Sequence, residues 1–139
     1  MIIALDFDGT CVTHEFPNVG KDIGAVPVLK ELVAKGHKLI LWTMRSDREV
    51  LGAIRNEFII DEKGTFLTDA VNWFKENDIP LYGIQKNPTQ INWTTSPKCY
   101  AERYIDDSAM GTPLIKSKEN RPFVDWRKMR KLLIKEGIL

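Results

Sequence analysis

Apolar and polar positions form blocks along this chain, and the blocks predict strands and helices in alternating order. Short apolar runs that end at a polar residue are typical of strands buried on both faces of a sheet. Apolar residues spaced three and four positions apart are typical of helices with one buried side. The predicted strands are residues 2–5, 38–42, 80–84, 103–105 and 112–115, and the predicted helices are residues 26–35, 47–58, 68–77 and 126–136.

Irregular stretches separate these elements. Residues 11–23 contain proline and glycine without clear periodicity, which predicts a loop or a small hairpin. Residues 86–98 carry two prolines and several polar side chains, which predicts a second loop. The pattern over residues 59–65 favours neither helix nor strand and includes a predicted turn at 62–64.

The alternating order of strands and helices predicts an α/β fold. Parallel strands need crossover connections, and helices usually supply them. We therefore expect one domain over residues 1–139, with a doubly wound, mostly parallel sheet and helices on both faces. Ligands bind such sheets outside the carboxyl ends of the strands, so polar residues that follow the strands are the candidates for function.

Composition limits the classes of partner. The chain has 20 Lys and Arg residues against 19 Asp and Glu residues, and a net charge of +1 gives no overall field that favours nucleic acid or a membrane. Eight basic residues nevertheless lie between Lys116 and Lys135. We interpret most of them as the solvated outer face of the closing helix, with a salt-sensitive nucleic-acid contact as the less favoured alternative.

Several absences in the sequence predict a cytoplasmic protein. The first apolar run is too short for a signal peptide, and no run approaches the roughly 20 apolar residues of a membrane span. Cys11 and Cys99 have neither a disulfide framework nor a metal-ligand spacing, which fits a reducing compartment. We expect no membrane partner, and the sequence does not fix the oligomeric state.

Acidic residues follow two of the predicted strands in pairs. Asp6 and Asp8 come directly after the first strand, and Asp106 and Asp107 follow the strand that ends at residue 105. Carboxylates crowded at one edge of a sheet repel each other unless a cation or a proton lies between them. Oxygen ligands of this kind favour a hard divalent ion, so we expect Mg²⁺ as the cofactor.

Three motifs carry a family resemblance. The run Asp6-Phe7-Asp8-Gly9-Thr10, then Thr43 after the second strand, then Asp106-Asp107 resemble the motifs of the haloacid dehalogenase-like hydrolase superfamily in order and spacing. The segment from Lys98 to Asp107 also resembles that of small bacterial and phage members. Most characterised members are Mg²⁺-dependent phosphatases, so the resemblance implies a phosphohydrolase that acts on a small phosphorylated substrate.

The resemblance also implies a role for each matching residue. Asp6 would be the nucleophile that forms an aspartyl-phosphate, and Asp8 would be the general acid and then the base. Thr43 would hydrogen-bond a phosphoryl oxygen. The implied metal ligands are Asp6, Asp8 through its backbone carbonyl, Asp106, and Asp107 as a ligand or a supporting residue.

A lysine is implied beside Asp6 as well. Lys98 lies eight residues before Asp106, as in the small members, and is the preferred candidate. Its strand should carry the chain away from the site, however. Lys86 follows the third predicted strand directly and therefore remains the alternative.

Further substrate contacts are assigned around these residues. Gly9 permits a tight bend in which backbone amides face a phosphate, so Gly9 and Thr10 are assigned to substrate binding. Arg45 lies two residues beyond Thr43, and contact with a substrate phosphate or simple exposure to solvent are equally good interpretations.

The spacing of the motifs indicates a member without a cap domain. Only 36 residues separate Asp6 from Thr43, which leaves little room for an inserted cap and predicts an open site. Two other functions compete with a small-molecule phosphatase. One is a polynucleotide-end phosphatase that uses the basic C-terminal residues, and the other is a non-enzymatic phosphoacceptor or binding module such as a receiver domain. In a receiver the acidic pair precedes the acceptor aspartate, whereas here the pair comes last.

Overall fold

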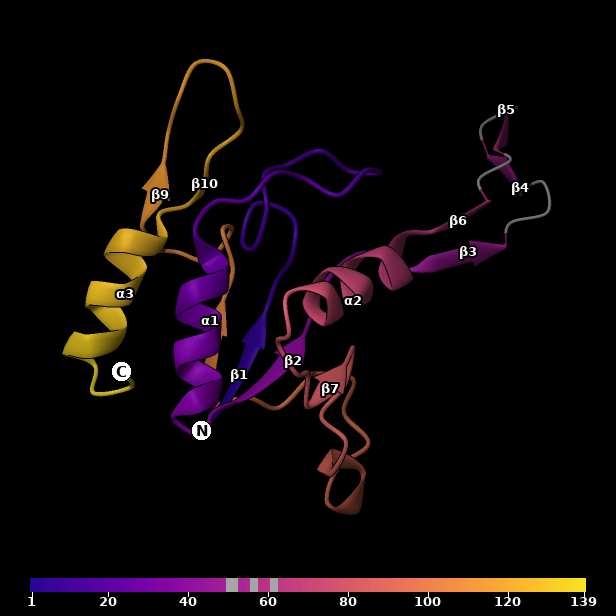
Figure 1. Cartoon of the computed structure of the whole chain (residues 1–139). Helices are drawn as coiled ribbons and strands as arrows, with labels where there is room; N and C mark the ends of the chain where they lie inside the picture. The colour runs from indigo at the N-terminus through magenta and orange to yellow at the C-terminus, as the bar shows by residue number, and fades with distance from the viewer. Residues whose placement is uncertain (50–52, 56–57, 61–62) are drawn as a thin grey trace.

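The computed structural model describes residues 1–49, 53–55, 58–60 and 63–139, and the core of this described part contains a four-stranded parallel sheet (Figure 1). The strands lie in the order β7 (Gly83–Ile84), β2 (Lys38–Leu41), β1 (Ile2–Leu5) and β8 (Arg103–Ile105), and each neighbouring pair is parallel. This arrangement confirms the prediction of an α/β fold with a mostly parallel sheet. All four strands fall within predicted ranges, although β7 is shorter than expected.

The strand register brings the carboxyl ends of three strands to one edge of the sheet. Leu5 pairs with both Leu41 and Ile105, so β1, β2 and β8 end at the same level. The Asp6 amide donates to the Ile105 carbonyl at 3.0 Å, and the Trp42 amide donates to the Leu5 carbonyl at 2.9 Å. These bonds extend the pairing by one residue, so the polar residues that follow the three strands emerge side by side.

One face of the sheet packs against the helices. Successive side chains of a strand point to opposite faces, and on this face Ile3 and Leu5 of β1 join Leu39 and Leu41 of β2 in the buried core. Each described α-helix contributes residues to the same core. These helices are α1 (Ala25–Ala34), α2 (Phe66–Glu76) and α3 (Trp126–Lys135), which confirms three of the predicted helices to within two residues at each end.

The opposite face is in contact with the crossover from β7 to β8. Ala4 pairs with Tyr104, so both side chains point to this face, and the Tyr104 hydroxyl donates to the Cys99 carbonyl at 2.6 Å. Every residue of the crossover is described, and it contains the 3-10 helix η1 (Gln90–Asn92) but no α-helix. The expectation of helices on both faces of the sheet is therefore wrong for this face, which a loop covers. The separate prediction of a loop over residues 86–98 is confirmed.

The predicted helix over residues 47–58 is wrong at the described positions. Strands β3 (Asp47–Glu49) and β6 (Lys63–Thr65) pair with each other, and β4 (Ala53–Arg55) pairs with β5 (Phe58–Ile60), each pair antiparallel. Residues 50–52, 56–57 and 61–62 lie outside the described part, including one position of the predicted turn at 62–64. The aromatic and β-branched run Phe58–Ile60 favours a strand, and cross-strand pairing has overridden the helical spacing. Figure 1 shows these strands extending from the sheet beyond α2.

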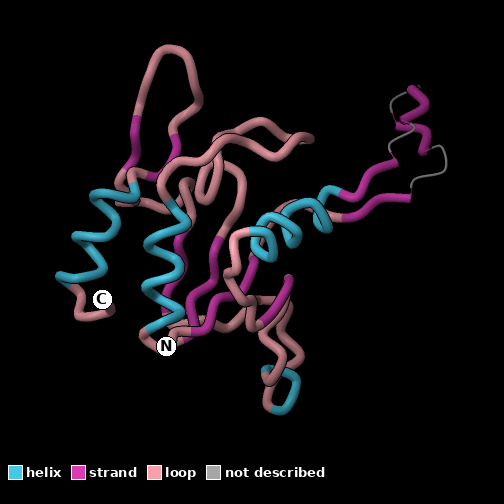
Figure 2. The backbone as a smooth tube through the Cα atoms, viewed as in Figure 1, coloured by secondary structure: helices cyan, strands magenta, loops and turns pink. Residues whose placement is uncertain are grey.

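A second antiparallel pair lies near the C-terminus. The strand predicted at 112–115 is present as β9 (Leu114–Ile115), but it pairs with β10 (Phe123–Val124) instead of extending the main sheet (Figure 2). The Val124 amide donates to the Gly9 carbonyl at 2.9 Å, which fixes this hairpin beside the loop that follows β1. Asp125 caps α3, because its carboxylate accepts from the amides of Arg127 and Lys128. None of the described helices has the length and apolar character that crossing a membrane requires.

Candidate functional site

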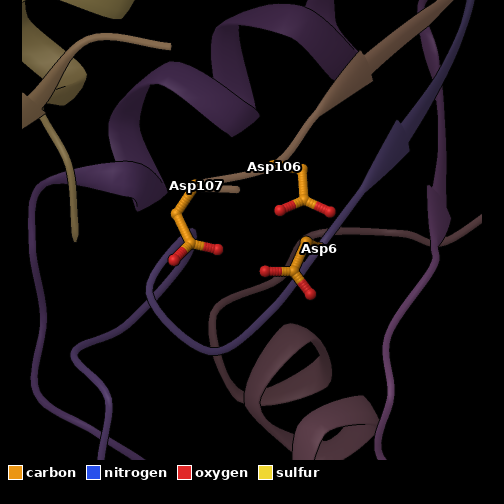
Figure 3. A group of neighbouring side chains, drawn as sticks. All are labelled: Asp6, Asp106 and Asp107. Atoms are coloured by element: carbon orange, nitrogen blue, oxygen red, sulfur yellow. The ribbon is translucent and has the colours of Figure 1, made fainter. Parts of the chain in front are cut away.

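Three aspartates from two strand ends converge at the carboxyl edge of the sheet. Asp6 follows β1, and Asp106 and Asp107 follow β8. Each contributes one carboxylate oxygen to a group whose members all lie within 4.8 Å of one another, and Figure 3 shows the three side chains gathered around one space. The structure therefore brings together three of the four aspartates that the sequence assigned to a metal site.

Thr10 joins these carboxylates through its hydroxyl group. Its Oγ1 donates to Asp6 Oδ2 at 2.8 Å and accepts from the Asp107 amide at 3.0 Å. The Thr10 side chain is fully buried, and the Trp126 indole donates to its carbonyl at 2.7 Å. The structure thus uses Thr10 to orient Asp6, which differs from the predicted contact with substrate.

The electrostatics of Asp6 reflect its crowded position. Burial raises the pKa of the Asp6 carboxyl group from 3.8 to about 7. The hydrogen bond from Thr10 opposes the rise, whereas the charges of Asp106 and Asp107 add to it. An ionised Asp6 is therefore poorly stabilised by the protein alone. Three oxygen donors around one space supply the ligand chemistry that Mg²⁺ prefers, so these residues fit such an ion.

His14 approaches the cluster from the loop after β1. Its Nε2 atom lies 3.0 Å from Asp107 Oδ2 and 3.1 Å from the Pro122 carbonyl oxygen. Both neighbours are acceptors, so we assign the proton of the ring to Nε2. Sequence reasoning missed this contact, because 93 residues separate the partners and His14 has no ligand spacing of its own.

Gly9 makes room for this contact. Its φ of +78° lies in the left-handed region, and a Cβ atom there would overlap the His14 ring and lie 2.7 Å from Asp107 Oδ2. The tight bend predicted at Gly9 is present. The predicted amides are engaged elsewhere, however: the Gly9 amide donates to the Val12 carbonyl and the Thr10 amide to the Phe7 carbonyl. In this conformation neither amide is available to a phosphate.

Asp8 is turned toward a buried arginine. Arg45 Nε donates to Asp8 Oδ2 at 2.7 Å, and Nη2 donates to Asp8 Oδ1 at 2.7 Å. The remaining guanidinium hydrogens bond to backbone carbonyls of Pro17, Asn18 and Phe66. Arg45 is only 2% exposed. This placement contradicts both interpretations of Arg45 made from the sequence, because the side chain neither faces solvent nor has a donor left for a substrate.

A pocket of about 310 Å³ opens beside Asp6, and Thr43 lines it as predicted. Gln85 fixes the backbone at Thr43: its Oε1 accepts from the Thr43 amide at 2.9 Å, and its Nε2 donates to the Thr43 carbonyl at 2.6 Å. Sequence reasoning did not identify Gln85, which lies 42 positions away. The lining residues are Asp6, Trp42, Thr43, Met44, Gln85 and Asp106.

The predicted lysine is not at this pocket. Lys86 and Lys98 are both described and exposed, and neither forms an ion pair with an aspartate of the cluster. Lys98 Nζ instead lies 5.9 Å from the centre of the Tyr104 ring. The structure therefore brings neither candidate into contact with Asp6.

Comparisons with known proteins add a structural relative. No family model and no curated protein matches the chain. Among solved structures, it is similar to a conserved protein from Bacteroides thetaiotaomicron, with a TM-score of 0.70 and 31% sequence identity. The match covers 99% of this chain and 91% of that one. The description of the relative names no activity.

Proposed function

This chain belongs to the same family as the conserved protein from Bacteroides thetaiotaomicron, and from the geometry of its site we propose that it is a Mg²⁺-dependent phosphohydrolase that cleaves phosphate monoesters through an aspartyl-phosphate on Asp6. The observation that carries the proposal is the placement of Asp6. Its carboxylate lies in a cluster with Asp106 and Asp107, and it also lines a pocket with Thr43.

We propose that Asp6, Asp106 and Asp107 hold the metal ion. An ion bound there would offset the repulsion between an anionic phosphate and the anionic nucleophile, and it would polarise the phosphoryl group. The Asp8 carbonyl, which the family resemblance implies as a further ligand, stays a prediction. His14 and Thr10 would keep Asp107 and Asp6 in position, because each bonds to one of these carboxylates.

In the proposed reaction Asp6 attacks phosphorus. A bond forms between an Asp6 oxygen and phosphorus, and the bond from phosphorus to the leaving oxygen breaks with its electron pair. Water then attacks phosphorus of the phosphorylated Asp6, which releases inorganic phosphate and restores the carboxylate. Thr43 lines the pocket, and in the proposed reaction its hydroxyl binds a phosphoryl oxygen.

The haloacid dehalogenase-like assignment and the lack of a cap domain belong to this proposal. So does a doubly wound chain path, which runs from β1 to β2 and β7 on one side and returns to β8 on the other, with a loop instead of a helix on the second face. The strand order, with β1 between β2 and β8, and the positions of Asp6, Thr43 and Asp106 after those strands support it. We also propose a cytoplasmic location, which the free thiols of Cys11 and Cys99 support.

Substitution of the nucleophile tests the proposal. Release of inorganic phosphate from para-nitrophenyl phosphate is measured with Mg²⁺ and with EDTA. We expect turnover that needs Mg²⁺ and is abolished in Asp6→Asn. The matched control is Asp78→Asn, because Asp78 is exposed, lies outside the site and has a φ of +54° that asparagine tolerates. Full activity of Asp6→Asn would exclude the mechanism. A single phosphorylation event without steady-state turnover would favour a phosphoacceptor module.

One observation favours a second candidate, a phosphatase for nucleic-acid ends. The loop between β9 and β10 is exposed and basic, and it ends at Pro122, whose carbonyl lies 3.1 Å from His14. Its cations are Lys116, Lys118 and Arg121. A polyanion that entered the site would pass near this loop. Activity on phosphorylated oligonucleotides that falls steeply with salt, with a weaker salt effect on small substrates, would support this function.

A further inference from the structure

We propose that the substrate of this site is a phosphate monoester whose alcohol part carries a planar aromatic or heteroaromatic ring, and that this ring stacks on Trp42. The inference rests on the proposed phosphohydrolase function and names the class of substrate for that site. It follows from an apolar wall, formed by Trp42 and Met44, that lies beside Asp6 in the pocket.

The register of the sheet places Trp42 next to Asp6. Leu5 pairs with Leu41, and the Trp42 amide donates to the Leu5 carbonyl at 2.9 Å, so Asp6 and Trp42 follow neighbouring strands at the same level. Leu5 and Leu41 both belong to the core on the face that packs against the helices. Because successive side chains of a strand alternate, those of Asp6 and Trp42 point to the other face, where both line the pocket.

Trp42 differs from the other three tryptophans in having no packing role within the described part of the chain. Trp126 belongs to the core, Trp73 packs against it, and the Trp93 ring lies edge-on to that of Tyr100 with centres 5.5 Å apart. Among the described residues, Trp42 is in neither the core cluster nor an aromatic pair. It is partly exposed, so its indole offers a ligand an aromatic surface that the fold does not use.

Met44 extends the apolar wall toward solvent. It is 97% exposed and lines the same pocket. A flexible thioether adapts to the shape of a ligand and makes favourable contacts with aromatic rings. The residues on either side of Met44 are fixed by Gln85, whose Nε2 donates to the carbonyls of Thr43 at 2.6 Å and Arg45 at 3.0 Å. The backbone that carries the wall is therefore held in place before a substrate binds.

The apolar wall is the part of the described lining that the proposed reaction leaves for the alcohol. Both aspartates of the lining serve the nucleophile and the ion, Thr43 serves the phosphoryl group, and Gln85 holds backbone groups. A pocket of about 310 Å³ has the size of a site for a small ligand. Stacking on an indole needs only a π-face, which every aromatic or heteroaromatic ring has.

Inhibition of the Mg²⁺-dependent hydrolysis of para-nitrophenyl phosphate tests this inference. The inhibitors are adenosine 5′-phosphate and methyl riboside 5-phosphate, which share the phosphoryl group and the oxygen that carries it but differ in the ring. We expect adenosine 5′-phosphate to bind about 5–150-fold more tightly, which is the contribution of one stacked base. Equal inhibition constants would overturn the inference and leave the proposed phosphohydrolase intact. No hydrolysis of para-nitrophenyl phosphate would reject both.

A second pair of inhibitors separates stacking from simple burial of apolar surface. Benzyl phosphate and cyclohexylmethyl phosphate are similar in size, and only the first has an aromatic ring. We expect benzyl phosphate to bind about 2–10-fold more tightly, as aromatic pairs contribute beyond the area that they bury. Equal binding, or tighter binding of cyclohexylmethyl phosphate, would show that the wall accepts any apolar group and would overturn the inference.

Variants assign the preference to Trp42. In Trp42→Leu the two ribose phosphates should inhibit almost equally, and Trp42→Phe should keep part of the difference because it keeps a ring. Met44→Ala, at an almost fully exposed position, should also reduce the difference and serves if Trp42→Leu does not fold. The matched control is Trp93→Leu, an exposed tryptophan outside the pocket lining, which should leave both inhibition constants unchanged. A preference that survives in folded Trp42→Leu, or in Met44→Ala if Trp42→Leu does not fold, would overturn the inference.

Discussion

The variant Asp6→Asn should stabilise the metal-free protein at neutral and alkaline pH while removing its proposed activity. Asparagine has nearly the same shape as aspartate, and its carbonyl oxygen still accepts the hydrogen bond that Thr10 donates to Asp6. It removes one negative charge from a buried cluster in which Asp106 and Asp107 lie within 4.8 Å of Asp6. A residue selected for binding and chemistry commonly reduces the stability of the fold in this way.

The magnitude follows from the pKa of Asp6. The folded protein raises that pKa from 3.8 to about 7, so the folded state binds the proton more tightly than the unfolded state does. Stability therefore falls as the pH rises from about 4 to about 7 and stays low above that range. At about 1.4 kcal/mol per pKa unit the full effect is about 4 kcal/mol, and partial exposure to solvent reduces it to about 2–4 kcal/mol.

Urea denaturation in EDTA measures this effect. At pH 8 we expect the free energy of unfolding of Asp6→Asn to exceed that of the wild type by about 2–4 kcal/mol, and near pH 4 we expect the two proteins to be nearly equal. Mg²⁺ at about 100 times its dissociation constant should largely cancel this difference, because binding adds about 2.7 kcal/mol to the protein that binds. Equal or lower stability of Asp6→Asn at pH 8 in EDTA would show that the ionised Asp6 carboxylate does not destabilise the folded protein, and would contradict this reasoning.

Three further substitutions have defined outcomes. Gly9→Ala should lower the thermal stability and weaken Mg²⁺ binding measured by calorimetry, because the added Cβ displaces His14 from Asp107. Unchanged Mg²⁺ binding would show that the contact between His14 and Asp107 does not support the ion site. Gln85→Leu should lower kcat/KM without a matching loss of Mg²⁺ affinity, because the Thr43 backbone loses both of its partners on Gln85. Asp125→Ala should reduce the free energy of unfolding by about 1 kcal/mol in urea titrations while activity is retained, since it removes only the cap of α3.

The strand-end aspartates were predictable because two local signals coincide in them. Apolar runs identify buried strands, and a parallel sheet brings the carboxyl ends of its strands to one edge. These two facts place Asp6, Thr43 and Asp106 together before any coordinates are known, and the pocket that they line agrees with this. The helices confirmed at α1, α2 and α3 likewise depend on local spacing.

The contacts that the sequence did not reveal are long-range ones. His14 reaches Asp107 and Gln85 reaches Thr43 across 93 and 42 positions, and no local pattern specifies either partner. Arg45 was misjudged for a similar reason, since its burial comes from Asp8 and from carbonyls of two other segments. The predicted helix at 47–58 failed because strand pairing decides the conformation of such a segment more than its own spacing does.

Identification of the phosphorylated residue during turnover is the most direct measurement. Protein mixed with acetyl phosphate and Mg²⁺ is quenched in acid within one turnover, and its peptides are analysed by mass spectrometry. After the acid quench we expect a phosphoryl group on the peptide that contains Asp6. We expect no phosphorylated peptide in EDTA or in the Asp6→Asn variant. Steady phosphate release with no label on Asp6, or with label on another residue, would contradict the role proposed for this carboxylate.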